Sequence, residues 1–206
     1  MTDHAVRPAR ARDLPLLAAI EDSGLAMFEA VLGDLSGDAL ASPAVSGHVR
    51  AAEPGFILVA GDPVVGFAHV VDLESHAHLD QISVHPDHAG RGVGTALLEG
   101  AAQRATLKGH GSLTLTTYAD IAWNAPFYAR HGFAEFADDE LGEVGVPVEE
   151  VDACMTHRRV ACDHHEPGAR GALGEVELRQ VALPRGAYCV VGHGVTVDSP
   201  VVRLYS

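Results

Sequence analysis

Cysteine, positive charge and long apolar runs are all scarce in this chain of 206 residues. Its three cysteines, Cys154, Cys162 and Cys189, are too few and odd in number for a disulfide framework, so we expect reduced thiols. The 14 Lys and Arg residues face 28 Asp and Glu residues, and the formal net charge is -14. Nucleic-acid-binding proteins need a basic footprint, so this class is excluded and cationic partners are favoured.

No apolar stretch approaches the ~18 residues of a membrane span, and the N-terminal sequence MTDHAVRPARARD has no apolar run of signal-peptide length. We therefore expect a cytoplasmic protein that does not bind membranes. The length allows a substantial core, and an apolar content of 47% is ordinary for a globular domain.

The stretch from His78 to Leu98, HLDQISVHPDHAGRGVGTALL, reads as a strand joined to a helix by a glycine-rich turn. Apolar and polar residues roughly alternate over its first seven positions, which is the period of a strand. Pro86 cannot donate to a sheet ladder and ends that strand. Beyond the turn, Val93, Leu97 and Ala101 recur at helical spacing, so the helix is predicted to lie on a sheet.

The turn brings together groups that bind an anion. Its backbone N–H groups lie at the positive end of the helix dipole, and Gly90, Gly92 and Gly94 let a phosphate approach closely. The turn lacks the Lys-Ser or Lys-Thr pair of a P-loop, and Leu97 stands where a dinucleotide fingerprint has its third glycine. Two interpretations remain: a pyrophosphate cradle, and glycines that only permit tight packing of helix on strand.

The same turn resembles the acetyl-CoA-binding motif of the GCN5-related N-acetyltransferase (GNAT) superfamily. That motif has Gln or Arg, two residues, Gly, one residue, and Gly or Ala, and Ala89 here replaces the first Gln or Arg. A second segment over 123–133, WNAPFYARHGF, is similar to the family's helix with Asn, Phe-Tyr and a terminal Gly-Phe. The resemblance covers about 5–159.

The resemblance implies an α/β (α+β) fold, with a mixed central sheet flanked by helices in a single domain over 1–159. Residues 160–206 lie beyond it as an extension with no assigned role. A hairpin in that extension would pack on the sheet edge or exchange between the subunits of a homodimer, and a poorly ordered extension is the other alternative.

Periodicity and turn residues predict the remaining elements coarsely. Two strands are joined by a hairpin at Gly61-Asp62-Pro63. The expected strands are 5–7, 56–60, 64–71, 113–117, 133–136 and 151–155, and the expected helices are 12–22, 28–37, 43–52 and 124–132.

The implied activity is transfer of an acetyl group from acetyl-CoA to a primary amine. The cofactor-binding residues that follow from the two motifs and the strand are Ile82, Ser83, Val84, Ala89, Gly90, Arg91, Gly92, Val93, Gly94, Thr95, Asn124 and Tyr128. Tyr128 resembles the tyrosine that protonates the leaving thiolate, and a core aromatic is the alternative. Asn124 is expected to cap its helix and to contact the pantetheine arm.

The amine must lose a proton before it attacks, and His78 and Asp80 are the candidate bases. Both fall where the family keeps its base, and alternation places them on one side of the strand. Histidine, with a pKa near 6.5, suits a proton relay, whereas an Asp carboxyl near 3.9 would need raising by burial. His78 is therefore the first candidate, and an ordinary surface histidine is the alternative. No metal is expected, because a second ligand cluster is missing.

The acceptor is a small-molecule or peptide amine, and an acidic segment favours a cationic one. No Lys or Arg lies between His131 and His157. That interval holds Glu135, Asp138, Asp139, Glu140, Glu143, Glu149, Glu150 and Asp152. A negative rim would concentrate an ammonium, although an ordinary solvated acidic loop has the same composition. The alternative to an enzyme is an acetyl-CoA-binding or assembly module without turnover.

Overall fold

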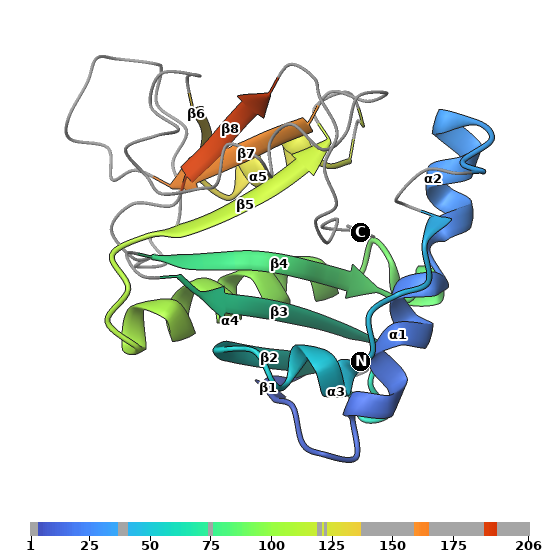
Figure 1. Ribbon diagram of the computed structural model, residues 1–206, viewed down its shortest axis with the longest axis horizontal. Coiled ribbons are helices and arrows are strands. Elements are labelled where there is room, and N and C mark those ends of the chain that lie inside the picture. Colours follow the sequence, from blue (N-terminus) through green and yellow to red (C-terminus); the bar gives the residue numbers. More distant parts are fainter. Residues whose placement is uncertain are drawn as a thin grey trace.

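Eight strands form one mixed sheet in the order β1-β2-β3-β4-β5-β7-β6-β8 (Figure 1). The computed structural model describes residues 4–36, 41–73, 76–118, 121, 123–136, 159–164 and 188–192. The strands are β1 Val6–Pro8, β2 Gly55–Ala60, β3 Gly66–Asp72, β4 Ala77–Val84, β5 Leu113–Tyr118, β6 Phe133–Phe136, β7 Arg159–His164 and β8 Tyr188–Gly192. The predicted mixed sheet is confirmed.

Helices lie against both faces of this sheet. They are α1 Leu14–Asp22, α2 Leu25–Leu32, α3 Gly47–Arg50, α4 Val93–Leu107 and α5 Ala125–Arg130, and a short 3-10 helix spans Pro86–His88. The long helix α4 packs across β1 to β4 on one face of the sheet (Figure 1). Helix α1 contacts β3 and β4, and α3 packs against α1. None of the helices in the described ranges is long and apolar enough to cross a membrane.

The core follows from the periodicity of α4. Val93, Leu97 and Ala101 are buried on one face of the helix, as predicted, and they join the largest apolar cluster together with strand residues such as Leu79 and Ile82. Each fully buried Leu or Ile contributes about 1.5–3 kcal/mol relative to an exposed one. A second cluster lies under α1, and a third joins α2 to the end of β5.

The hairpin between β2 and β3 is confirmed. Ala60 lies opposite Gly66 in an antiparallel register, and Gly61 adopts a φ of 83° in the turn. This hairpin places β3 beside β4, where β3 is the only strand paired with the second half of β4 within the described ranges.

Two irregularities in β4 shape its surroundings. The register with β3 shifts between His69 and Val70, which pair with Gln81 and Leu79, so Asp80 is an extra residue in a β-bulge. On the other side, β4 pairs with β5 in parallel only from Ala77 to Leu79. The two strands then part, as Figure 1 shows at the end of the sheet near α1.

The C-terminal strands belong to the same sheet. The strand β7, which starts at the predicted boundary of the extension, pairs with both β5 and β6, and β8 pairs with β6 and β7. The predicted strand at 151–155 and most of the predicted C-terminal hairpin lie outside the described residues, as does the acidic segment beyond Phe136. The domain boundary at 159 therefore stays a prediction.

Candidate active site

The glycine turn leads directly into the N-terminus of α4. Gly90 and Gly92 have φ values of 68° and 80°, and Gly92 is the N-cap residue without a side-chain capping bond. A Cβ added at either glycine would meet no atom within 4 Å, so both positions face open space. The first N–H groups of a helix have no acceptor within the helix. The turn thus combines open surroundings, donor groups and a positive helix end, which is the geometry of an anion site.

Other residues of this motif have different surroundings. The side chain of Arg91 is exposed, Val93 is buried in the core, and the N–H of Ala89 donates to Pro86 O at 3.1 Å. The Thr95 hydroxyl lies 3.2 Å from His131 Nε2, and His131 Nδ1 lies 2.7 Å from Phe127 O. His131 therefore donates from Nδ1 and accepts from Thr95, which ties the start of α4 to the end of α5.

The turn also packs against α5 at Gly94. A Cβ on Gly94 would lie 3.8 Å from the Phe127 ring, which is an ordinary van der Waals distance. Phe127 in turn contacts Tyr128, with ring centroids 5.2 Å apart. The predicted anion turn and the predicted acid are thus neighbours in space, although 34 or more residues separate them in the chain.

Three buried polar side chains near α5 have no hydrogen-bond partner within the described part of the chain. They are the hydroxyl of Tyr128, the amide of Asn124 and the hydroxyl of Thr117. Tyr128 and Asn124 are 0% exposed and Thr117 is 1% exposed. A buried polar group without a partner costs about 1–3 kcal/mol, so a ligand that bonds to these groups would remove a real penalty.

The structure corrects the expectation for Asn124 and adds Thr117. Asn124 is the N-cap residue of α5, but its side chain makes no capping bond, so the predicted cap is wrong and the amide is available for a ligand. Burial raises the pKa of Tyr128 well above its ordinary value of 10, so its hydroxyl remains a donor. Thr117 was not predicted, since a Thr in a strand of the sequence LTLTTY carries no distinguishing signal.

The strand residues expected to contact the cofactor lie in the part of β4 that, among the described strands, pairs with β3 alone. Ile82, Ser83 and Val84 are buried and pair with β3, and no described strand pairs with their other side. An unpaired strand edge offers N–H and C=O groups to an extended ligand. This edge fits a ligand arm that carries amide groups.

His78 is held by β5 in a single orientation. Its Nδ1 lies 2.6 Å from the Thr114 hydroxyl, which also lies within 3.5 Å of Ala77 O. If the hydroxyl donates to Ala77 O, Nδ1 donates to the hydroxyl, and Nε2 carries the lone pair. The residue is 8% exposed. Burial lowers the pKa of His78 to about 4, against a raising effect of the Asp80 charge, so the imidazole is neutral at neutral pH.

Asp80 does not have the raised pKa that a carboxylate base requires. Burial alone would raise the pKa of Asp80, but the hydrogen bond from His69 and the charge of Arg50 outweigh burial and lower it. Its Oδ2 accepts from Arg50 at 2.6 Å and lies 2.9 Å from His69 Nδ1. Asp80 therefore remains an anion at neutral pH.

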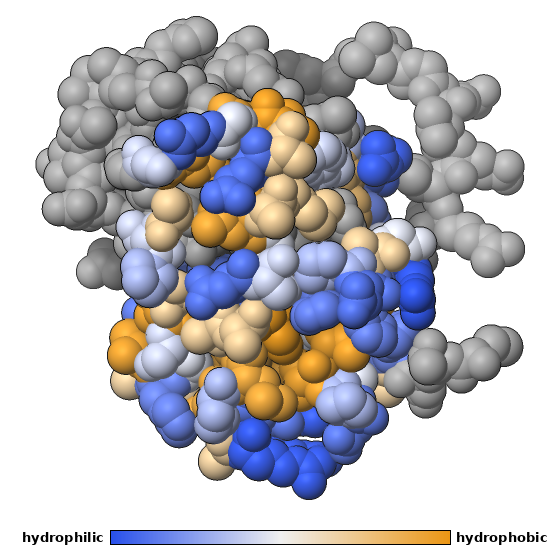
Figure 2. Space-filling model, turned by 90° about the vertical axis from the view of Figure 1, so that its right-hand side faces the viewer, coloured by the Kyte–Doolittle hydropathy of each residue, from blue (hydrophilic) through white to orange (hydrophobic). Residues whose placement is uncertain are grey.

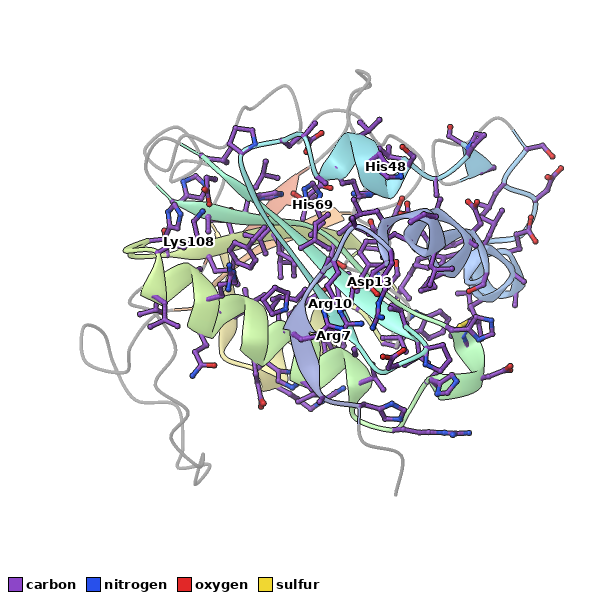
Figure 3. The ribbon with its side chains drawn as sticks, turned by 90° about the horizontal axis from the view of Figure 1, so that it is seen from below. Arg7, Arg10, Asp13, His48, His69 and Lys108 are labelled. Carbon is purple, nitrogen blue, oxygen red and sulfur yellow. The ribbon has the colours of Figure 1, made fainter. Side chains whose placement is uncertain are left out.

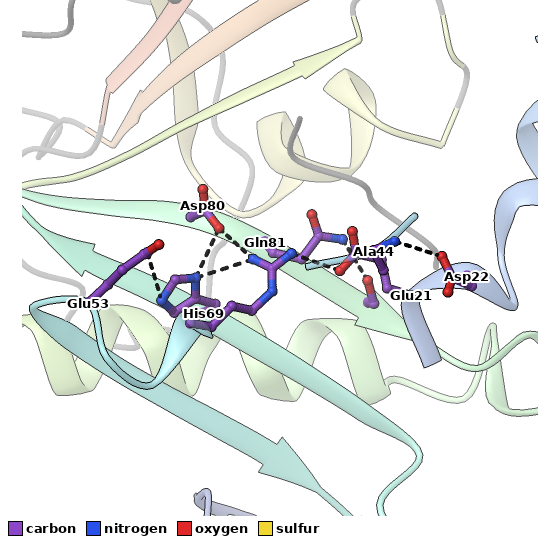
Figure 4. Close-up of polar contacts among 9 residues, drawn as sticks. Glu21, Asp22, Ala44, Glu53, His69, Asp80 and Gln81 are labelled. Carbon is purple, nitrogen blue, oxygen red and sulfur yellow. Dashed lines mark hydrogen bonds and ion pairs between the residues drawn. The ribbon is translucent and has the colours of Figure 1, made fainter. Parts of the chain in front are cut away.

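Arg50, Glu21 and His69 were not predicted, and all three belong to a buried polar network around Asp80 (Figure 4). His69 lies between α3 and the sheet, as Figure 3 shows from below. A cationic side chain is rarely buried without a partner, but nothing in the sequence around Arg50 shows that it is buried. The network joins residues up to 30 positions apart in the chain.

The parts of the site lie on two sides of β4. The turn at Gly90–Gly94 and Tyr128 lie on the side of α4 and α5, whereas His78 and Asp80 bond to groups outside that apolar cluster. Among the described residues, no group of three or more His, Cys, Asp or Glu side chains is placed to hold a metal ion.

Comparisons with known proteins agree with this geometry. Residues 53–135 match the family model described as an acetyltransferase (GNAT) domain, a range that runs from the end of α3 through β6. The mycothiol acetyltransferase of Streptomyces avermitilis is 34% identical over 125 residues, which cover 53% of this chain and 40% of that protein. The chain thus spans less than half of that relative's length.

Two crystal structures share the fold. The GCN5-related N-acetyltransferase of Rhodopseudomonas palustris is 29% identical, with a TM-score of 0.52 and coverage of 66% of this chain and 85% of that one. The PaiA N-acetyltransferase of Thermoplasma acidophilum, determined in complex with coenzyme A, is 18% identical, with a TM-score of 0.52 and coverage of 64% and 90%. The family model and the 29% identical structure identify residues 53–135 as a GNAT acetyltransferase domain and support membership of the GNAT superfamily.

Proposed function

We propose that this protein is an N-acetyltransferase that moves the acetyl group of acetyl-CoA to the nitrogen of a primary amine, and that this amine is cationic in solution. The observation that carries the proposal is the contact between the turn at Gly90–Gly94 and α5. It brings an anion-binding helix N-terminus next to α5, where the buried side chains of Asn124 and Tyr128 are unpaired among the described residues.

These residues fit coenzyme A. The turn and the first N–H groups of α4 would hold the diphosphate. The free edge of β4 over 82–84 would pair with the amides of the pantetheine arm, and Asn124 and Thr117 would complete its hydrogen bonds. When bound, acetyl-CoA supplies the acetyl thioester with its electrophilic carbonyl carbon.

The chain's own residues would then move two protons. In the tautomer in which Nδ1 donates to Thr114, His78 Nε2 accepts the proton that the ammonium loses before the neutral amine attacks. Tyr128 donates its hydroxyl proton to the departing thiolate sulfur as the C–S bond breaks, and the second proton that the nitrogen loses once the C–N bond has formed restores the Tyr128 hydroxyl. A backbone N–H of the β4 edge near Ile82 to Val84 would polarise the carbonyl oxygen.

A low pKa does not exclude His78 from this role. The imidazole is neutral at neutral pH and therefore has a free lone pair before the amine arrives. The negative charge of Asp80 opposes the effect of burial on the imidazolium, and the pKa of about 4 already includes this contribution. The positive charge stays within the site, first on the amine and then on the imidazole.

The second candidate function is a binding or assembly module that holds acetyl-CoA without turnover. The cradle and the β4 edge support this function equally well, because neither performs chemistry. The two functions differ in whether His78 and Tyr128 are needed, because only an acetyltransferase would use them to move protons.

Thiol release from acetyl-CoA with a panel of primary amines tests the proposal, with mass spectrometry to identify the acetylated product. The panel includes the acceptor of mycothiol acetyltransferase, given the 34% identity. We expect His78→Ala and Tyr128→Phe to slow transfer by roughly 10²-fold each while the Kd for acetyl-CoA stays within about twofold. Coenzyme binding without any transfer would establish the binding module instead.

A further inference from the structure

Three charged side chains meet inside the protein on the α1 side of the sheet. Arg50 Nη1 lies 2.6 Å from Asp80 Oδ2, and Arg50 Nη2 lies 2.8 Å from Glu21 Oε2. The side chains of Arg50 and Glu21 are each 3% exposed and that of Asp80 is 12% exposed. They come from α3, α1 and the bulge of β4, so this network connects all three elements.

The charges in this network do not cancel. Two carboxylates share one guanidinium, which leaves one excess negative charge. His69 and Glu53 extend the network, with His69 Nε2 3.6 Å from Glu53 Oε2. A positive charge on His69 would be balanced by the negative charge of Glu53, and a neutral His69 would contribute no positive charge to the network. The buried neutral His78 adds no positive charge either. A buried excess charge is costly, so the site favours a cation.

The geometry indicates where that cation would bind. Both Arg50 and His69 contact Asp80 through Oδ2, and Oδ1 accepts no hydrogen bond from any described residue. Figure 4 shows this second oxygen pointing away from His69. Asp80 lies at the point where β4 separates from β5, because strand pairing ends at Leu79. Oδ1 is thus the accessible oxygen of a carboxylate whose other oxygen is fixed.

We propose that Asp80 is the anchor that selects an ammonium acceptor, and that Arg50, held by Glu21, is the positioning residue that fixes its carboxylate. This inference rests on the proposed acetyl transfer, and it assigns Asp80 to substrate recognition, leaving proton removal to His78. Acceptors with an uncharged nucleophilic nitrogen would lack this anchor. The Asp80 charge also acts on His78, so the anchored nitrogen and the proton acceptor lie in one electrostatic field.

The hydrogen-bond pattern explains why Arg50 does not repel the acceptor. Its two terminal nitrogens are committed to Glu21 and to Asp80 Oδ2, and its guanidinium lies 5.8 Å from the centre of the Phe67 ring. Both terminal nitrogens of Arg50 therefore face carboxylates, and Asp80 Oδ1 is left without a hydrogen bond from any described residue. Glu21→Gln would remove the excess negative charge of the network without removing a group that contacts the acceptor. This variant therefore tests the effect of charge separately from the effect of direct contact.

Equilibrium binding to the full chain loaded with coenzyme A tests the proposal. The probes are benzylamine, spermidine and alanine amide, which carry ammonium groups at neutral pH, and benzoic hydrazide, which has an uncharged nucleophilic nitrogen. We expect Asp80→Asn to raise the Kd of the bound ammonium probes at least about tenfold, equivalent to about 1.4 kcal/mol, and to leave benzoic hydrazide unchanged. Arg50→Gln and Glu21→Gln should raise the ammonium Kd by smaller factors.

The matched control is Arg7→Gln. Arg7 Nη1 lies 2.6 Å from Asp13, and the Asp13 side chain is 4% exposed, so this variant also breaks a short Arg–Asp pair. Figure 3 shows Arg7 and Asp13 together near the start of α1, apart from His69. Arg7→Gln should leave all four Kd values unchanged, and a thermal melt of each variant identifies any that does not fold.

The outcomes separate this proposal from the proposed function. Loss of ammonium binding in Asp80→Asn and Glu21→Gln, with wild-type acetyl transfer intact, supports both. Ammonium binding that Asp80→Asn leaves intact overturns the anchor, whatever the activity. Equal losses for ammonium probes and hydrazide, or no ammonium binding by the wild type, also overturn it. Ammonium binding without acetyl transfer in the wild type overturns only the proposed function. If Asp80→Asn does not fold, Glu21→Gln decides the result.

Discussion

Replacement of His78 by Gln removes a titrating group whose charged form burial disfavours. The pKa of His78 is about 4 in the folded protein, against about 6.5 in an unfolded chain. Between these two values the unfolded chain binds a proton and the folded chain does not, so wild-type stability falls as the pH drops. The gap between the two pKa values corresponds to roughly 3 kcal/mol once the pH is below both.

Urea unfolding at about pH 7 and about pH 4.5 measures this effect. At pH 7 the histidine is neutral in both states, and its ionisation contributes nothing to stability. At pH 4.5 the wild type should have lost about 2–3 kcal/mol through this residue. His78→Gln lacks this loss, so its free energy of unfolding should fall less with acid by the same amount. An exposed histidine, His48 on α3, supplies the control His48→Gln.

Two results would refute this reasoning. An equal acid dependence in the wild type and in His78→Gln would show that the imidazole is not held neutral by burial. A similar reduction of acid dependence in His48→Gln would show that the effect does not depend on burial at all. The lowered pKa of Asp80 also makes stability fall in acid, but both proteins keep that carboxyl, so the comparison isolates His78.

Four substitutions test the rest of the site. Thr114→Val removes the partner of His78 Nδ1 and should lower kcat by roughly tenfold with an unchanged Kd for acetyl-CoA; an unchanged kcat contradicts the proposed orientation. Tyr128→Phe removes a buried unpaired hydroxyl, so the coenzyme-free protein should melt at the same or a higher temperature while transfer slows. Gly92→Ala places a side chain at a φ of 80° and should cost about 1–2 kcal/mol and weaken coenzyme binding. Gly94→Ala meets only ordinary contacts in the first turn of α4, so calorimetry should show stability unchanged or raised by up to about 1 kcal/mol with coenzyme binding retained, and equal effects of the two glycine substitutions would contradict the cradle geometry.

Local signals predicted the framework of the site. The periodicity of Val93, Leu97 and Ala101 identified the buried face of α4, and the glycine spacing identified the turn before it. The hairpin at Gly61 followed from turn residues. Each of these features is determined by residues within a few positions of one another, which is the range over which sequence patterns are informative.

Contacts between distant residues were not predictable in this way. The ion pair of Arg50 with Asp80 joins α3 to a strand that lies 30 residues further on, and Glu21 enters from a third element. The lowered pKa of Asp80 follows from its contacts with His69 and Arg50, which come from other elements, so the sequence could not supply it. The unpaired side chain of Asn124 is another example, because a helix-capping residue type carries no information on whether its side chain makes the cap.

The face of the molecule beside α1 and α2 exposes apolar side chains, which the amino-acid composition alone does not reveal. Figure 2 shows apolar patches between charged side chains on this side of the molecule. Leu16 of α1 and Val31 of α2 are 44% and 52% exposed. The expected helix at 12–22 lies close to α1, whereas the expected helix at 28–37 begins and ends later than α2, Leu25–Leu32.

The β-bulge at Asp80 shifts the alternation of β4, so odd-numbered residues face the core before Asp80 and even-numbered residues face it afterwards. Leu79 and Ile82 both reach the α4 core although they are three positions apart, while His78 contacts β5 outside that core. Deletion of Asp80 would restore simple alternation with His78, Ile82 and Val84 on their present sides, whereas a regular strand of the same length would turn either His78 or the pair Ile82 and Val84 to the wrong side. A β4 segment of the same length taken from a related protein would therefore preserve both the core and the site only if it also has a β-bulge. That bulge must lie opposite the register shift between His69 and Val70.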